Sequence, residues 1–103
     1  MSYSDEEIDE ALERIAGDVA RRAGQADFPE QAVTALLAHL RRMEAARRAG
    51  DSAGAVEAAG HARLGLETYR PTNATSRAKA VLAEIVAGIV NEPGHDLRHS
   101  SGA

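Results

Sequence analysis

The stretch that decides the fold is Ala80–Val90, which reads AVLAEIVAGIV and has Glu84 as its one polar side chain. At helical spacing its large apolar side chains cover about half of the circumference, whereas a helix with one buried side needs an apolar arc of about 100°. These side chains are Val81, Leu82, Ile85, Val86, Ile89 and Val90. A helix of this kind must be covered by more than one neighbour, so the segment predicts a helix at the centre of a bundle.

Two helices are expected in the first half of the chain. The first begins after Ser4, because Ser4 and Glu7 have the spacing of a capping box, and it ends near Gly24. Its apolar seam is narrow, which places it at the edge of the bundle, and consists of Ile8, Leu12, Ile15 and Val19. The second begins at Asp27–Glu30, with a proline in its first turn, and runs to about Arg48. Its apolar face consists of Val33, Leu36, Leu37, Leu40 and Met43.

The third helix, about Ser52–Tyr69, has the weakest pattern, because its larger apolar residues do not share one stripe. Each glycine inside it weakens the helix by about 1 kcal/mol relative to alanine. The glycines, at positions 54, 60 and 65, indicate either close approach to a neighbouring helix or a locally mobile segment. Pro71 ends this helix, and Thr72, Asn73 or Thr75 is the expected cap of the fourth.

These elements predict an all-α four-helix bundle with short loops, formed by residues 1–92 as a single domain. Residues 93–103 are expected to be a flexible, disordered C-terminal tail. In the expected arrangement the fourth helix lies at the centre, the first two pack on it, and the third covers the remainder. The wide apolar surface of the fourth helix, set against alanine-rich partners, indicates burial beyond one chain, in a homodimer or by a docked protein partner.

Composition narrows the function classes. The chain has 103 residues and no cysteine, which excludes a disulfide framework and a thiolate metal site. The first ten residues are acidic, unlike a signal peptide, and the apolar run at 80–90 is shorter than the roughly 20 residues that span a bilayer. We therefore expect a cytoplasmic protein with no membrane contact. The pattern also predicts no cofactor, no metal and no small-molecule substrate.

Charge is segregated along the chain. Residues 1–30 carry nine acids and three arginines, whereas residues 31–80 carry four acids and eight basic residues. One interpretation is steering of a partner or of a second copy, and the other is the preference of acids for helix starts and arginines for helix ends. Among the arginines, Arg41 and Arg48 share a helix face, which makes nucleic-acid binding an alternative function. No aromatic side chain lies among them to stack bases.

A second alternative comes from the segment Gly50–Glu57, which reads GDSAGAVE. It resembles the prosthetic-group attachment site of acyl carrier proteins, in which a serine opens a helix after an aspartate. The resemblance implies a carrier domain modified with phosphopantetheine on Ser52. It covers about eight residues and departs from the family at Ala53, where leucine is preferred. Asp51 and Ser52 are also ordinary residues for a helix N-terminus.

The histidines suggest little chemistry. His95 and His99 would share a helix face with Asp96 between them, but they fall in the expected tail. His61 follows Glu57 by one turn, as in a surface pair, and His39 flanks the apolar face of the second helix. The acids of the first helix lie off its seam, so they lack the burial that tunes a general acid or base. The sequence does not predict an enzyme.

The function expected from these patterns is a non-enzymatic protein–protein interaction or regulatory module. We expect the partner to be bound by the apolar fourth helix and the flanking arginines, or by the alanine- and glycine-rich face of the third helix. The predicted partner-binding residues are Val81, Ile85, Val86, Ile89, Val90, Arg41 and Arg48. Ser52 is the candidate modification site.

Overall fold

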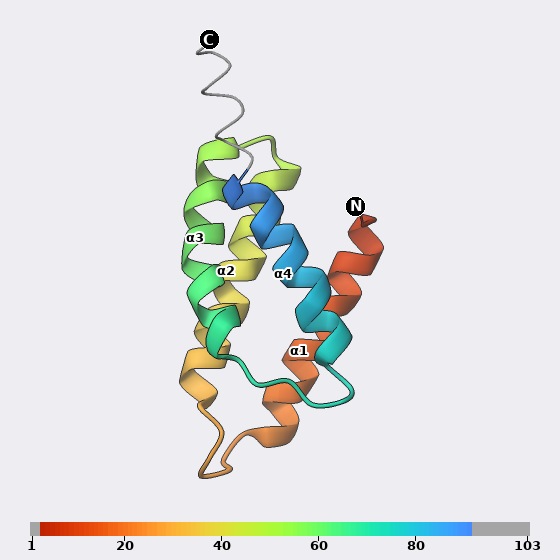
Figure 1. Cartoon of the computed structure of the whole chain (residues 1–103), viewed down its shortest axis with the longest axis vertical. Helices are drawn as coiled ribbons and strands as arrows, with labels where there is room; N and C mark the ends of the chain where they lie inside the picture. The colour runs from red at the N-terminus through yellow and green to blue at the C-terminus, as the bar shows by residue number, and fades with distance from the viewer. Residues whose placement is uncertain (1–2, 92–103) are drawn as a thin grey trace.

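The computed structural model describes residues 3–91, which form four helices joined by short connections (Figure 1). The helices are α1 (Asp5–Arg22), α2 (Glu30–Arg48), α3 (Ser52–Thr68) and α4 (Ser76–Asn91). The predicted all-α four-helix bundle is thus confirmed. The predicted tail, with His95 and His99, lies outside the described residues.

The helix ends follow from local chemistry. Ser4 and Glu7 form the predicted capping box, in which the Ser4 hydroxyl accepts from the Glu7 amide at 3.1 Å and the Glu7 carboxylate accepts from the Ser4 amide at 2.8 Å. Gly24 and Gly50 lie just after α1 and α2. Their φ angles are 87° and 78°, a backbone conformation that residues with a side chain rarely adopt. Pro29 stands immediately before α2 rather than inside its first turn.

Each helix packs against two neighbours, so the bundle is a ring in the order α1, α2, α3, α4 (Figure 1). The prediction that the second helix packs on a central fourth helix is wrong, because α4 lies diagonally across from α2. The most extensive contact joins α2 to α3. The inner face of α3 carries small side chains that allow this approach, namely Ala55, Ala58, Ala59 and Ala62.

One glycine of α3 is explained by this close approach. A Cβ atom placed on Gly65 would lie 3.0 Å from Cδ1 and 3.1 Å from Cβ of Leu36 on α2. Gly60, in contrast, has no neighbouring atom within 4 Å of such a Cβ. The close-approach interpretation of the α3 glycines therefore holds at Gly65 and fails at Gly60.

α4 contributes Ala78, Val81, Leu82 and Val86 to the core. Ile85, Ile89 and Val90 pack against the core from the side and are half-buried. The other three helices supply most of the remaining core, so the greater part of the apolar arc of α4 is covered by its own chain. Because α1 and α3 both contact α4, the helix is wrapped on two sides, as its wide apolar arc requires.

The two glycines give a matched test of the α2–α3 contact. We expect Gly60→Ala to raise the free energy of unfolding by about 0.5–1 kcal/mol, because it restricts the unfolded chain and meets open space. Gly65→Ala is expected to lower it by about 1 kcal/mol, because overpacking against Leu36 outweighs that gain. Urea denaturation measures both, and equal stabilisation by the two variants would contradict the contact.

Candidate functional site

The outer side of α4 is nearly free of charge. Its exposed residues from the second residue onward are Arg77, Ala80, Glu84, Ala87, Gly88 and Asn91. We call this surface the α4 face. Its two charged side chains, Arg77 and Glu84, are seven residues apart and therefore lie on the same side of the helix, with Ala80 between them. The exposed side of α1, by comparison, carries a charged residue at almost every position of its first half.

Five of the predicted partner-binding residues belong to α4, and the structure divides them into two groups. Val81 and Val86 are buried in the core at 6% and 2% exposure, so their side chains are already covered within the chain. Ile85, Ile89 and Val90 are half-buried and pack against the edge of the core. These three flank the α4 face, where part of their apolar surface remains in contact with solvent.

A groove of about 350 Å³ runs beside the α4 face, between α1 and α4. Its floor includes Ala11 and Val81, and its walls carry Glu10 and Arg14 from α1 and Arg77 from α4. Arg14 pairs with Glu10 at 2.9 Å. Arg77 forms no ion pair with any residue in the 3–91 range. The groove thus has an apolar floor and a rim of mixed charge, because Glu7 and Glu10 of α1 line it together with Arg14 and Arg77.

Tyr3 also lines this groove and lies beside Glu84. Partial burial of the phenol and the neighbouring carboxylate of Glu84 raise the pKa of Tyr3 above its ordinary value of 10.0. The tyrosine therefore stays neutral at physiological pH.

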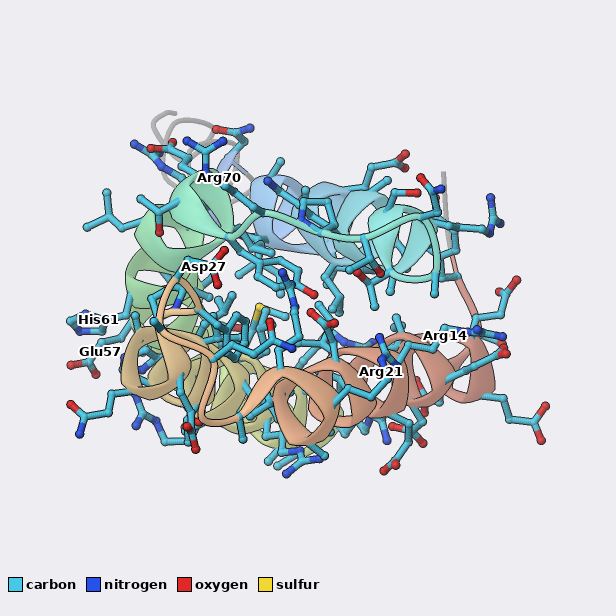
Figure 2. All side chains as sticks on the ribbon, turned by 90° about the horizontal axis from the view of Figure 1, so that it is seen from below. Arg14, Arg21, Asp27, Glu57, His61 and Arg70 are labelled. Carbon is cyan, nitrogen blue, oxygen red and sulfur yellow. The ribbon has the colours of Figure 1, made fainter. Side chains whose placement is uncertain are left out.

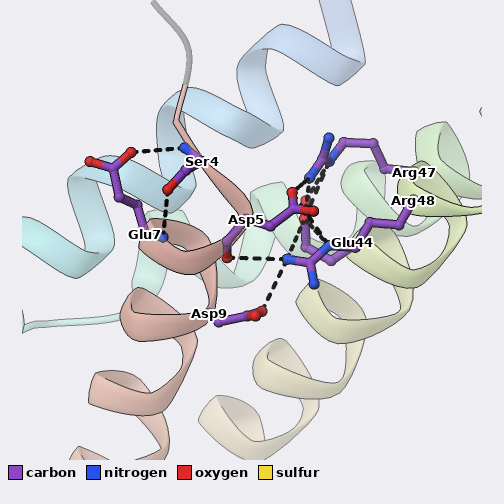
Figure 3. A network of polar contacts seen from close by, with 7 residues as sticks. All are labelled: Ser4, Asp5, Glu7, Asp9, Glu44, Arg47 and Arg48. Atoms are coloured by element: carbon purple, nitrogen blue, oxygen red, sulfur yellow. Dashed lines mark hydrogen bonds and ion pairs between the residues drawn. The ribbon is translucent and has the colours of Figure 1, made fainter.

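The predicted arginine pair has a different setting from the one expected. Arg48 bonds to Asp9 at 3.0 Å and to the buried carboxylate of Glu44 at 3.3 Å (Figure 3). Arg47 bonds to Glu44 and to Asp5, both at 2.8 Å. The opposite charges of the first two helices therefore meet each other within the fold. This internal pairing is a third explanation of the charge segregation, beside steering and helix-end preference.

Arg41 is exposed, and it borders a shallow hollow that also contains Asp9, Glu13 and Glu44. A nucleic-acid phosphate approaching Arg41 and Arg48 would meet these carboxylates as well. The arrangement does not form a basic patch, because the acids of α1 lie beside both arginines.

Ser52 is exposed as the first residue of α3. The carboxylate of Asp51 accepts a hydrogen bond from the amide of Gly54 at 3.0 Å, which is the N-cap interaction of this helix. The cap accounts for the Asp51–Ser52 pair in the sequence. Ser52 itself stays accessible to solvent.

A buried polar cluster, absent from the sequence expectations, connects three parts of the chain. The Asp18 carboxylate has no exposed surface and accepts a hydrogen bond from the Tyr69 hydroxyl at 2.6 Å and from Arg22 Nε at 3.1 Å. The hydroxyls of Tyr69 and Thr75 are 3.1 Å apart, and Arg22 also donates to the carbonyl of Arg70 at 2.9 Å. The cluster joins the end of α1 to the connection before α4.

Burial would by itself raise the pKa of Asp18, but the hydrogen bonds from Arg22 and Tyr69 hold the pKa of this carboxyl below its ordinary value of 3.8. A carboxyl whose pKa is lowered in the folded state stabilises the fold above its unfolded pKa. That contribution is lost as the pH falls through the folded pKa. The cluster thus stabilises the protein at neutral pH, and this contribution is lost as the pH falls from the ordinary pKa of 3.8 through the lower pKa of the folded state.

No known protein family, no curated protein and no solved structure matches this chain. Within residues 3–91, no helix combines the length and the apolar character needed to cross a membrane. The interpretation of the site therefore depends on the residues themselves.

The buried cluster predicts a specific pattern of stability changes. We expect Asp18→Ala to lower the free energy of unfolding by about 3 kcal/mol, because it leaves a part-buried arginine and a buried hydroxyl without their acceptor. Tyr69→Phe is expected to lower the free energy of unfolding by about 1.5–3 kcal/mol, the value of a hydrogen bond to a charged group. Glu13→Ala, on the exposed side of the same helix, is the control and should change stability by less than about 0.5 kcal/mol. Urea denaturation at pH 7 measures all three, and an Asp18→Ala protein as stable as the control would refute the assignment.

Proposed function

We propose that this chain is a non-enzymatic protein-interaction module, and that its α4 face binds a second copy of the chain. The observation that carries the proposal is the pairing of opposite charges on an otherwise uncharged surface, with Arg77 and Glu84 on either side of Ala80. In the proposal the module acts in the cytoplasm. The two buried carboxylates, Asp18 and Glu44, both have arginine partners, so their burial has a structural explanation.

The α4 face is complementary to itself when the α4 helices of two copies lie antiparallel. A two-fold axis passing between Ala80 and Val81 brings Arg77 of each copy opposite Glu84 of the other. The two charges are separated by seven residues, or about 10 Å along the helix. A two-fold interface requires a patch of this self-complementary kind, since each contact occurs twice.

Small side chains allow the two helices to approach closely. Ala80 lies beside the proposed axis and places little volume on the α4 face. The half-buried Ile85 flanks this position opposite the first turn of α4 in the other copy, and it would lose solvent contact in the dimer. Burial of its apolar surface favours association.

A charge exchange tests the orientation of the dimer. Arg77→Glu and Glu84→Arg, made separately, are each expected to shift the protein to monomer at concentrations where the unmodified chain is dimeric, because like charges then face each other. The double variant Arg77→Glu/Glu84→Arg is expected to regain the dimer, since opposite charges meet again. Sedimentation equilibrium over a range of concentrations measures the dissociation constants. A double variant no tighter than the single ones would refute this orientation.

A substitution beside the axis tests close approach without disturbing the monomer. Ala80→Arg exchanges one good helix former for another at an exposed position, so the monomer should stay folded, whereas the long side chain meets its own copy at the axis and should abolish the dimer. Ala20→Arg is the matched control, because Ala20 is an exposed alanine of α1. The control variant should remain folded and dimeric. Self-association through α4 is excluded if the unmodified chain is a monomer at every concentration, or if Ala80→Arg associates as tightly as the unmodified chain.

A further inference from the structure

Two histidines from different helices lie against each other on the side of the bundle opposite α1 and α4. The rings of His39 on α2 and His61 on α3 are stacked with their centroids 5.0 Å apart and an angle of 20° between their planes. His39 is half-buried and His61 is exposed. Glu57 precedes His61 by one turn, and both side chains project together into solvent in Figure 2. Solvent therefore reaches both imidazoles.

The contacts of His39 define its protonation. A guanidinium nitrogen of Arg42 lies 2.6 Å from Nδ1 of His39, and because arginine only donates, Nδ1 is the acceptor and its lone pair is engaged by Arg42. Burial, the charge of Arg42 and the proximity of His61 lower the pKa of His39 below 6.5. His39 is thus a neutral imidazole at pH 7, with its lone pair already directed at a cation. Neutral imidazole is the form that binds metal ions.

We propose that His39 and His61 form a two-histidine site for a divalent transition-metal ion, such as Zn²⁺, Ni²⁺ or Cu²⁺, and that Arg42 competes with the ion for His39. Two imidazoles on a tetrahedral zinc ion, each bound at about 2.0–2.1 Å, have ring centroids about 5 Å apart. The two rings are stacked with 20° between their planes, so their in-plane nitrogen lone pairs do not converge on one point as they stand. The two helices hold the side chains close enough to share one ion, and ligation needs both rings to rotate toward it.

The remaining coordination positions belong to water. Among residues 3–91 there is no group of three or more histidine, aspartate or glutamate side chains placed to hold one ion. Two nitrogen ligands favour the ions that bind imidazole most strongly, with Cu²⁺ ahead of Ni²⁺ and Zn²⁺. Binding at this site does not depend on the α4 face, because neither histidine belongs to α4 or to its neighbouring groove.

Isothermal titration of the full-length, untagged chain with ZnCl₂, repeated with NiCl₂, tests the site. We expect one ion per chain, and His39→Ala and His61→Ala are each expected to weaken binding at least about tenfold, because each removes one of two ligands. Arg42→Gln is expected to tighten binding, because it removes both a competing donor and a repelling charge. That gain is a result that general surface binding would not produce.

The tail histidines supply the control. His95→Gln/His99→Gln should bind Zn²⁺ with the same affinity as the unmodified chain, and NMR signals of the His39 and His61 rings should shift as the ion is added. Thermal unfolding without metal verifies that every variant is folded. The proposal would be overturned if His39→Ala and His61→Ala each bound Zn²⁺ as tightly as the unmodified chain, or if the tail variant lost binding. Unchanged affinity of Arg42→Gln would also overturn it.

Discussion

The bond between the Asp18 carboxylate and the Arg22 and Tyr69 side chains is the constraint on which the rest of the bundle depends. A carboxylate without solvent contact is costly unless it is paired and hydrogen-bonded. Here the partners come from α1 itself and from Tyr69, 51 residues further along the chain. Lys79 adds a bond of 2.7 Å to the carbonyl of Tyr69, so the first turn of α4 is attached to the same cluster. This connection sets where α4 begins relative to α1, and with it the groove between them.

Most of the secondary structure could be predicted from local sequence signals. The capping box at Ser4, the glycines after α1 and α2, and Pro71 after α3 are signals within a few residues of the helix ends, so all four helices could be predicted from them. The arrangement could not, because it depends on contacts between helices. The width of the apolar arc on α4 correctly indicated several neighbours, but it could not distinguish a centre from a corner. The close fit of Leu36 to Gly65, which makes α2 and α3 the tightest pair, appears only when both helices are placed.

The candidate sites likewise depend partly on local sequence signals and partly on contacts between helices. Ile85, Ile89 and Val90 are half-buried, whereas Val81 and Val86 are buried. The sequence does not distinguish these two groups, because all five are large apolar residues of the same helix. Asp18 follows Ile15 by three residues on the apolar seam of α1, and Arg22 follows Asp18 by four. An aspartate on an apolar seam, one turn before an arginine, was the sequence signal that could have indicated the buried cluster. Its other partner, Tyr69, is distant in the chain and could not be assigned from the sequence. The pairing of His39 with His61 likewise depends on the register of α2 against α3.

The two ends of α1 are attached in different ways. Its first turn is bound to α2 through Asp5 and Asp9, whose side chains are 60% and 57% exposed, while its last turn is bound through the fully buried Asp18. Dissolved salt screens exposed ion pairs far more than buried ones. High ionic strength should therefore loosen α1 from its N-terminal end and leave its C-terminal end anchored. At high ionic strength, amide hydrogens near the N-terminal end of α1 would then exchange with solvent faster than those near its C-terminal end. The helix would separate from the bundle starting at its N-terminal end.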